Sequence, residues 1–359
     1  MTLSVSVVST ARTLPRPVQN ARLTWTERAS CLITLESDDG VSGRGEAAPL
    51  PGFSPESLQA CQQALTALDL SDIAERLEPD QDLIGELGRA SVRIPPNLPA
   101  ARAALEGALL ELWARAAGVP AWQLLLPAGP APLQPAGPPP FSRAVAALLM
   151  GEPEQALEQA LAARARGVTT FKFKIGRAGA LDRELVAVEQ LRRELGPLAR
   201  LRLDANQALS VVEAQHYLPR FAECELEFIE EPCAPAQLAQ LSELGLPWAL
   251  DESLAAGAEP RAGDRAVILK PTLVGGIARC FALARAAQAI GAQVILSHAF
   301  EGPLGLGLSA ALALSIGSET MAQGLDLEGA RLAQLSLPFY AGARIQAWSE
   351  PGFGIAGQP

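Results

Sequence analysis

The sequence predicts an α/β protein in which a (β/α)8-type (TIM-like) barrel carries an α+β capping domain. Its 359 residues exceed one small core and suit a barrel of about 250 residues with an accessory domain of about 100. After a proline-rich stretch, short apolar strands alternate with amphipathic helices, which is typical of parallel strands joined by helical crossovers. Eight such units favour a closed barrel, and no GxGxxG motif follows the first strand to favour an open sheet.

The capping domain is predicted to span residues 1–125 and to be completed by the C-terminal segment 328–359. A helix is expected to begin near Pro55, because Ser54 can cap it and proline fits the first helical position. A second helix, Pro99–Ala117, is apolar on most sides, which predicts that it lies buried between layers. Short β patterns precede these helices, at Val5–Ser9, Cys31–Glu36 and Val41–Glu46.

Residues 126–140 are too rich in proline for a helix or a central strand, and they are predicted to link the two domains. The barrel is assigned to residues 141–327. Its predicted helices include Glu154–Arg166, Leu181–Glu194 and Ile277–Ile290. Its eight predicted strands, the last of them weak, are Arg143–Leu149, Thr169–Lys174, Arg200–Asp204, Leu226–Glu230, Trp248–Asp251, Ala266–Lys270, Gln293–Ser297 and Met321–Gly324.

Composition and charge argue against several classes of function. The chain carries 29 basic and 39 acidic residues, a formal charge of −10, without a Lys/Arg cluster long enough to follow a phosphate backbone. A nucleic-acid partner is therefore not expected. No apolar run approaches the roughly 20 residues of a membrane span, and the N-terminus lacks the pattern of a signal peptide. A cytoplasmic protein without a membrane partner is expected, and an oligomer remains open.

The cysteines and histidines restrict the metal chemistry. Five cysteines are widely spaced and form no CxxC pair, which indicates reduced thiols rather than a zinc or redox site. His216 and His298 are the only histidines, so a site with three histidine ligands is impossible. Any bound metal must be held mainly by oxygen.

Ionisable residues end five of the predicted strands, at Lys174, Asp204, Glu230, Asp251 and Lys270. All strands of such a barrel run in the same direction, so their C-terminal ends share one face, where active sites of this architecture lie. A single charge at a strand end is more often a solvated rim residue. All five together, on consecutive strands, indicate one site.

Strand periodicity predicts which side chains enter the barrel. In Phe171–Lys174 alternate residues face opposite sides, so Lys172 and Lys174 point inward when the phenylalanines pack under the helices. The carboxylates of Asp204, Glu230 and Asp251 can supply oxygen ligands to an octahedral Mg²⁺. The flanking lysines would then be proton-transfer groups.

Five segments together resemble the enolase superfamily, in particular its muconate-lactonizing-enzyme-like subgroup. They are the KxK strand Phe171–Lys174, Leu203–Asn206, Ile229–Pro232, Asp251–Ser253 and Leu269–Pro271. The resemblance implies that Asp204, Glu230 and Asp251 bind the metal, with Glu231 as the fallback ligand. It implies that Lys174 and Lys270 are the catalytic lysines on opposite faces of a small carboxylate substrate. Such sites combine a Lys or His base with one or two Mg²⁺ ions.

The same resemblance implies further contacts and a reaction. Substrate contacts are assigned to Lys172, Asn206, Ser297, Gly324 and Phe53. Local likenesses at Gly45–Ser54, Glu230–Cys233 and Gly324–Asp326 indicate dehydration of a cyclohexadiene carboxylate to an aromatic product. His298 is interpreted as a rim or packing residue rather than an acid–base group.

Other reactions share the same metal site and both lysines. An N-succinylamino acid racemase or a dipeptide epimerase would return the proton on the other face of the substrate. Dipeptide epimerases resemble one another in an Asp-x-Asp motif at the last strand, and Gly324 stands at its first position here, which argues against that class. A non-catalytic barrel would be expected to lack a ligand or a lysine, and neither is missing.

Overall fold

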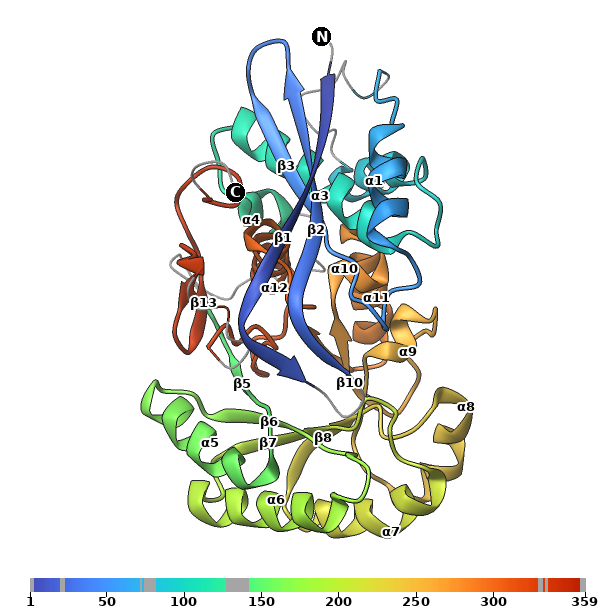
Figure 1. The fold of residues 1–359 in the computed structure, drawn as a ribbon, viewed down its shortest axis with the longest axis vertical. Helices are drawn as coiled ribbons and strands as arrows, with labels where there is room; N and C mark the ends of the chain where they lie inside the picture. Colours follow the sequence, from blue (N-terminus) through green and yellow to red (C-terminus); the bar gives the residue numbers. More distant parts are fainter. Residues whose placement is uncertain are drawn as a thin grey trace.

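The computed structural model describes residues 3–19, 23–71, 73, 82–126, 142–328, 332 and 335–355. It combines an antiparallel sheet near the N-terminus with a seven-stranded sheet in the middle of the chain, and helices pack on both (Figure 1). This arrangement confirms the predicted α/β barrel with an N-terminal cap. Within the described residues, no helix is long and apolar enough to cross a membrane.

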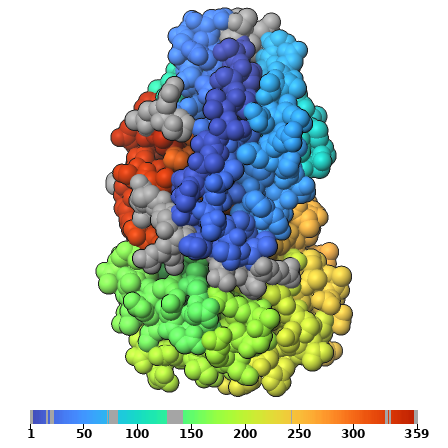
Figure 2. Space-filling view, in the orientation of Figure 1, coloured from blue at the N-terminus to red at the C-terminus, as the bar shows by residue number. Residues whose placement is uncertain are grey.

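The N-terminal sheet contains a ribbon much longer than the short strands expected from sequence. β1 (Leu3–Gln19) pairs with β2 (Thr24–Ser37) from Leu3 to Thr13 and again at Val18 and Gln19, with a register shift between these parts. β3 (Ser42–Ala47) pairs with the other edge of β2. Figure 2 shows β1, in dark blue, running along the front of the molecule to the green and yellow part of the chain. The far end of the ribbon therefore reaches the parallel sheet.

Four helices follow this sheet in the chain: α1 (Leu58–Thr66), α2 (Leu83–Ser91), α3 (Pro99–Ala116) and α4 (Ala121–Leu125). α1 and α3 pack on the sheet, while α2 packs on α3 and on α11 (Ile277–Ala289), and α4 packs on α3 and on α12 (Pro303–Ser315). The prediction for α3 is confirmed, since most of its residues are buried. Gly45 allows β3 to approach it closely, because a Cβ at this position would lie 1.9 Å from the carbonyl oxygen of Ala104.

The predicted start of the first helix is wrong. α1 begins at Leu58, and the hydroxyl of Ser57, not of Ser54, accepts a hydrogen bond from the backbone N–H of Ala60. Ser54 instead accepts from the N–H of Leu50 at 2.8 Å, within the turn that precedes the helix.

The parallel sheet has the order β11-β10-β9-β8-β7-β6-β5, in which every neighbouring pair is parallel. Its strands are β5 (Ala146–Leu149), β6 (Thr170–Lys174), β7 (Arg200–Asp204), β8 (Leu226–Glu230), β9 (Trp248–Leu250), β10 (Asp264–Leu269) and β11 (Gln293–Leu296). The helical segments after them are η3 (Pro153–Gln155), α5 (Ala156–Ala165), α6 (Leu181–Leu195), α7 (Val211–Ala222), α8 (Pro235–Leu238), η4 (Ala239–Leu244), α9 (Glu252–Ala255), α10 (Pro271–Val274), α11 (Ile277–Ala289) and α12 (Pro303–Ser315).

The eighth predicted strand is reduced to two bridging residues. Gln323 bridges to Val145 and Gly324 to Ser297, so this short segment joins the two edges of the seven-stranded sheet. Regular pairing stops there because the Gln323 side chain replaces part of the ladder: its Oε1 accepts from the N–H of Leu296 at 2.8 Å. The barrel closes through these contacts.

The C-terminal segment returns to the N-terminal half of the molecule. β12 (Tyr340–Ala341) pairs with β13 (Arg344–Gln346), and β13 pairs with β4 (Ser142–Ala144), the start of the first predicted barrel strand. Further on, the indole of Trp122 donates to the carbonyl oxygen of Trp348 at 3.0 Å. Residues 127–140 of the predicted linker lie outside the described residues, and the proposed domain limits remain a prediction.

Buried carboxylates of the N-terminal half cap two barrel helices. Glu46 accepts from the N–H groups of Gly302 and Gly305 at the start of α12, and Glu106 accepts from the N–H of Ala278 at the start of α11. The first turn of a helix has unpaired N–H groups and a positive dipole end, which favour such acceptors. These contacts dock the cap on the barrel.

Glu106 makes this docking sensitive to pH, because burial raises its pKa from 4.5 to about 7. The folded chain then keeps a proton up to about pH 7 that the unfolded chain releases near pH 4.5, so the stability contribution of Glu106 falls as pH rises between these values. Glu106→Gln keeps an acceptor and cannot ionise. The free energy of unfolding of this variant, relative to the unsubstituted protein, should rise by roughly 3 kcal/mol between pH 5 and pH 8.

Urea denaturation at several pH values measures this difference, with the exposed Glu158→Gln as the matched control. If the difference in unfolding free energy between Glu106→Gln and the unsubstituted protein does not change with pH, Glu106 is not the group that makes the stability depend on pH.

Candidate active site and metal centre

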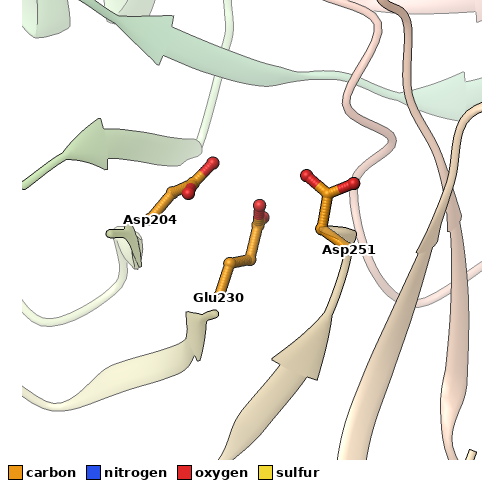
Figure 3. A group of neighbouring side chains, drawn as sticks. All are labelled: Asp204, Glu230 and Asp251. Carbon is orange, nitrogen blue, oxygen red and sulfur yellow. The ribbon is translucent and has the colours of Figure 1, made fainter. Parts of the chain in front are cut away.

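Three carboxylates meet at the C-terminal ends of three adjacent strands. Asp204 ends β7, Glu230 ends β8 and Asp251 follows β9, and their side chains converge (Figure 3). One oxygen of each lies within 4.8 Å of the others, and all three residues are buried. The convergence predicted from the strand ends is therefore present.

The lysines lie around this group. Nζ of Lys172 is 3.0 Å from Oδ2 of Asp204 and 2.7 Å from Oε2 of Glu230. Nζ of Lys174 is 2.5 Å from Oδ2 of Asp204 and donates to Oδ1 of Asn206 at 3.0 Å. Lys270 pairs with Asp251. Because β6 and β10 lie on either side of the strands that carry the carboxylates, Lys174 and Lys270 stand at opposite ends of the row.

The predicted alternation along β6 holds. Phe171 and Phe173 are buried in the hydrophobic cluster that includes side chains of α5 and α6, while Lys172 and Lys174 line a cavity in the barrel mouth. The phenylalanines anchor the strand and leave the amines free to point inward.

Lys172, Lys174 and Lys270 are the only lysines in the 359-residue sequence. Every other basic side chain apart from the two histidines is arginine, which stays protonated in proteins. The side-chain amines of this chain are thus confined to this cavity. This scarcity is a sequence signal for the site that does not depend on motifs.

Burial and crowding make the carboxylates electrostatically unequal. Burial alone would raise the pKa of Asp204, but Lys172 and Lys174 outweigh it and hold that pKa well below its usual range. Burial, opposed by Lys172 and reinforced by Asp204 and Asp251, raises the pKa of Glu230 to about 7. Desolvation disfavours the charge of Lys172, yet Asp204 and Glu230 raise its pKa. Glu230 is therefore the carboxylate of this cluster whose negative charge is least stabilised.

A buried carboxylate whose charge is poorly stabilised suits a divalent cation. The donors are all carboxylate oxygens, which Mg²⁺ prefers, and the group is buried in the barrel mouth. A cation among them would relieve the repulsion that raises the pKa of Glu230. Asp204, Glu230 and Asp251 could hold such an ion.

Glu231 has a different role from its neighbour Glu230. Its Oε1 accepts from the N–H groups of Asp251 and Ser253 at 2.9 Å, and its Oε2 accepts from the Ser253 hydroxyl and the Gln207 amide. These bonds occupy both oxygens and orient the segment that carries Asp251. Glu231 positions a carboxylate of the cluster and is not itself in the cluster.

Asn206 and Glu252 extend the polar network beside Lys174. Asn206 has a left-handed backbone (φ 45°), and its Nδ2 donates to Oε1 of Glu252 at 2.7 Å. Burial, together with Asp251 and Asp204, raises the pKa of Glu252 to about 8. Sequence reasoning did not assign a role to Glu252, although it directly follows Asp251.

The residues expected to contact substrate are only partly brought together. Ser297 and Gly324 line the cavity in the barrel mouth, which has a volume of about 60 Å³, along with the three lysines. Asn206 reaches it through its bond to Lys174. Phe53 is not among the lining residues; its ring lies 5.8 Å from that of Trp25, which in turn lies 6.3 Å from that of Phe300.

Phe300 is the wall residue that sequence reasoning missed. It lines the cavity with a left-handed backbone (φ 61°), which is unusual for a bulky residue. Its carbonyl oxygen accepts from Nη2 of Arg12 at 3.3 Å and from Nε of Arg28 at 3.4 Å. These two arginines, far away in sequence, hold the strained loop in place.

His298, next to this loop, is buried and lines the same cavity. Burial, followed by the charges of Lys270 and Lys172, lowers its pKa to about 3. Its Nδ1 accepts from the N–H of Phe300. A histidine that stays neutral and engaged with the backbone fits the packing interpretation.

Comparison with known proteins identifies the class. Residues 155–358 match the enolase C-terminal domain-like family, and residues 2–125 match the N-terminal domain of the mandelate racemase / muconate lactonizing enzyme family. The fold and the site thus define a barrel enzyme with an N-terminal cap domain. The chain belongs to the muconate-lactonizing-enzyme-like subgroup of the enolase superfamily.

Curated relatives include two o-succinylbenzoate synthases. The protein from Klebsiella pneumoniae (strain 342) is 30% identical over 324 residues, covering 87% of each chain. The protein from Enterobacter sp. (strain 638) is 32% identical over 319 residues, covering 86% of this chain and 85% of the relative.

Solved structures with the same fold carry several activities. Muconate lactonizing enzyme of Pseudomonas fluorescens has a TM-score of 0.79 at 23% identity, covering 98% of this chain and 95% of that one. N-succinyl Arg/Lys racemase of Bacillus cereus has a TM-score of 0.80 at 19% identity, covering 99% of this chain and 95% of that one. Dipeptide epimerase of Enterococcus faecalis, complexed with Mg and a dipeptide, has a TM-score of 0.79 at 22% identity, covering 99% of this chain and 100% of that one. These likenesses show the fold.

Binding of Mn²⁺ or Mg²⁺ tests the cluster directly. Asp204→Asn and Asp251→Asn should each lower the affinity for the cation by about 100-fold or more, because each removes a charged donor. Glu231→Gln should weaken it by only about tenfold, because this side chain orients a donor without supplying one.

Electron paramagnetic resonance of free Mn²⁺ measures these affinities, with Asp264→Asn at the distant start of β10 as the control. If Glu231→Gln weakens cation binding more than Glu230→Gln does, Glu231 is the ligand and the assignment of Glu230 fails.

Proposed function

We propose that the protein is an o-succinylbenzoate synthase, a hydro-lyase. It would dehydrate 2-succinyl-6-hydroxycyclohexadiene carboxylate to o-succinylbenzoate, a step of menaquinone or phylloquinone biosynthesis. The observation that carries the proposal is the pair Lys174 and Lys270 at opposite ends of a buried carboxylate row. Identities of about 30% to o-succinylbenzoate synthases over most of both chains support this reaction.

We assign Mg²⁺ to Asp204, Glu230 and Asp251. The magnesium named for the dipeptide epimerase of the same fold supports this choice. When bound, the cation supplies charge stabilisation to a substrate carboxylate as its α-proton leaves. When the cation binds Asp204 and Asp251, Lys174 and Lys270 can leave these carboxylates and contact the substrate instead.

Lys174 is the proposed base. In its neutral form it takes the ring proton next to the carboxylate: the C–H bond breaks, an N–H bond forms at Nζ, and the electron pair moves into the conjugated carboxylate. As this pair returns to form the aromatic ring, the C–O bond to the hydroxyl breaks. The Lys174 ammonium then protonates the leaving oxygen on the same face, and water departs.

Lys270 acts from the other side. Its pKa is raised, since the attraction of Asp251 and Glu252 outweighs desolvation, so it remains a cation. An ammonium against the ring stabilises the electron-rich intermediate more than the neutral substrate. Four of the remaining predicted residues would hold the substrate: Lys172, Asn206, Ser297 and Gly324. Phe53 would affect the substrate indirectly, through its ring contact with Trp25.

We further propose that residues 1–125, completed by 328–359, cap the barrel of residues 141–327 and exclude water during turnover, with 126–140 as the linker. The protein would act in the cytoplasm on a small-molecule carboxylate without a nucleic-acid or membrane partner. Gly324 speaks against a dipeptide epimerase, because a Cβ there would lie 2.8 Å from Oγ of Ser297, leaving no room for an aspartate.

Lys174→Ala and Lys270→Ala should each lower turnover of the cyclohexadiene substrate by about 10²- to 10⁴-fold, because each removes a group that acts in the transition state. The exposed Arg183→Ala is the control. With only three lysines, ¹³Cε-lysine NMR gives three signals, so each variant should lose one signal and keep the other two. Near-normal turnover in either folded variant would contradict the mechanism.

Substrate choice separates the proposed reaction from racemisation. Incubation with the cyclohexadiene carboxylate and Mg²⁺ should change the ultraviolet absorbance as the aromatic product forms, and EDTA should abolish the change. N-succinylamino acids in D₂O are the parallel test. Deuterium exchange at the amino acid α-carbon without any dehydration activity would reject the synthase in favour of a racemase.

A further inference from the structure

A second cavity, about 650 Å³ in volume, lies outside the barrel mouth and is about ten times larger than the catalytic one. One face of the β1–β2–β3 sheet, the start of α12 and the C-terminal segment form its walls. The proposed reaction leaves it without a role. Ligand cavities in proteins are typically about 300–1,000 Å³, so its size suits a small organic molecule.

The walls are apolar over most of their extent and cationic at one side. Leu32, Leu304, Leu335 and Leu337 come from three different parts of the chain, and each contributes a hydrocarbon surface. Arg12 and Arg28 lie on neighbouring strands of the same sheet face, directly opposite each other in the β1–β2 register. Such walls suit a molecule with an apolar body and an anionic end.

The two arginines form no direct ion pair with any described residue. Burial lowers the pKa of both guanidinium groups, and the nearby charges of Glu46 and Glu301 oppose this effect. Arg28 donates to the carbonyl oxygens of Ala48, Pro49 and Phe300, which are neutral acceptors. Within the described part of the chain, neither Arg12 nor Arg28 forms an ion pair with a carboxylate. Glu46 also lines the cavity, but both of its oxygens bind N–H groups of α12.

Arg12 has an unused donor. Its Nη2 donates to the carbonyl oxygens of Phe300 and Glu301, while its Nη1 is shielded from solvent and lacks an acceptor among the residues that the structure describes. A buried donor without an acceptor is unfavourable. An anionic oxygen in the cavity would be a strong partner for the Arg12 guanidinium, and a shift of this side chain would bring Nη1 to it.

We propose that this cavity is a second ligand site, for an amphipathic carboxylate whose apolar body packs on the leucines and whose carboxylate binds Arg12 beside Arg28. The site is separate from the catalytic cavity but shares a wall with it. The ring of Phe300 lines the catalytic side, and its carbonyl oxygen holds the two arginines of the second site.

Isothermal calorimetry with 2-naphthoate tests the site on the intact protein. We expect one molecule bound per chain, with an affinity at least tenfold higher than that of the neutral isostere 2-naphthamide. Saturating o-succinylbenzoate with Mg²⁺ should leave the stoichiometry unchanged. Arg12→Gln should remove the preference for the carboxylate and leave binding of the amide unchanged.

Two cavity-filling variants locate the binding. Leu335→Trp and, on the exposed side of β1, Thr10→Phe should each weaken 2-naphthoate at least tenfold, whereas Leu198→Trp on the remote surface should not. Thermal unfolding shows which variants are folded. The proposal is overturned if 2-naphthoate does not bind at 1 mM, or if it binds no more tightly than 2-naphthamide. It is also overturned if saturating o-succinylbenzoate abolishes the binding of 2-naphthoate, or if both cavity variants are folded and bind 2-naphthoate with unchanged affinity.

Discussion

Repulsion among three carboxylates buried at the ends of adjacent strands is the constraint on which the rest of the site depends. Isolated charges in such a place are costly, so the side chains persist only with cationic partners. Lys172 binds two of them, and Lys174 and Lys270 bind the outer members of the row. Burial, together with the charges of Asp204 and Asp251, raises the pKa of Glu230 despite Lys172, and a metal ion at this place would stabilise the ionised carboxylate.

The same constraint explains the distribution of basic residues. Lysines occur only in this cavity, and arginines carry the positive charge everywhere else in the sequence. An arginine cannot take part in proton transfer near neutral pH, whereas a lysine amine can when its surroundings lower its pKa. The chain thus keeps its three lysine amines around the carboxylate cluster and uses arginines for its other cationic contacts.

The cap is tied to the barrel by polar contacts that also shape the catalytic wall. Glu46 holds the start of α12, and Arg12 and Arg28 hold the carbonyl oxygen of Phe300 shortly before it. The left-handed backbone at Phe300 is costly by itself and persists because its surroundings determine it. One short loop therefore separates the catalytic cavity from the larger cavity under the cap sheet.

Local periodicity determined much of this protein. Alternation in Phe171–Lys174 and the ionisable strand ends predicted the barrel, the inward lysines and the carboxylate cluster, because side-chain direction along a strand depends only on neighbouring residues. Tertiary structure alone decided the full length of the ribbon, the reduction of the eighth strand to Gln323 and Gly324, and the wall at Phe300. These features depend on contacts between distant residues, such as Glu106 with Ala278, 172 positions apart, which leave no periodic trace in the sequence.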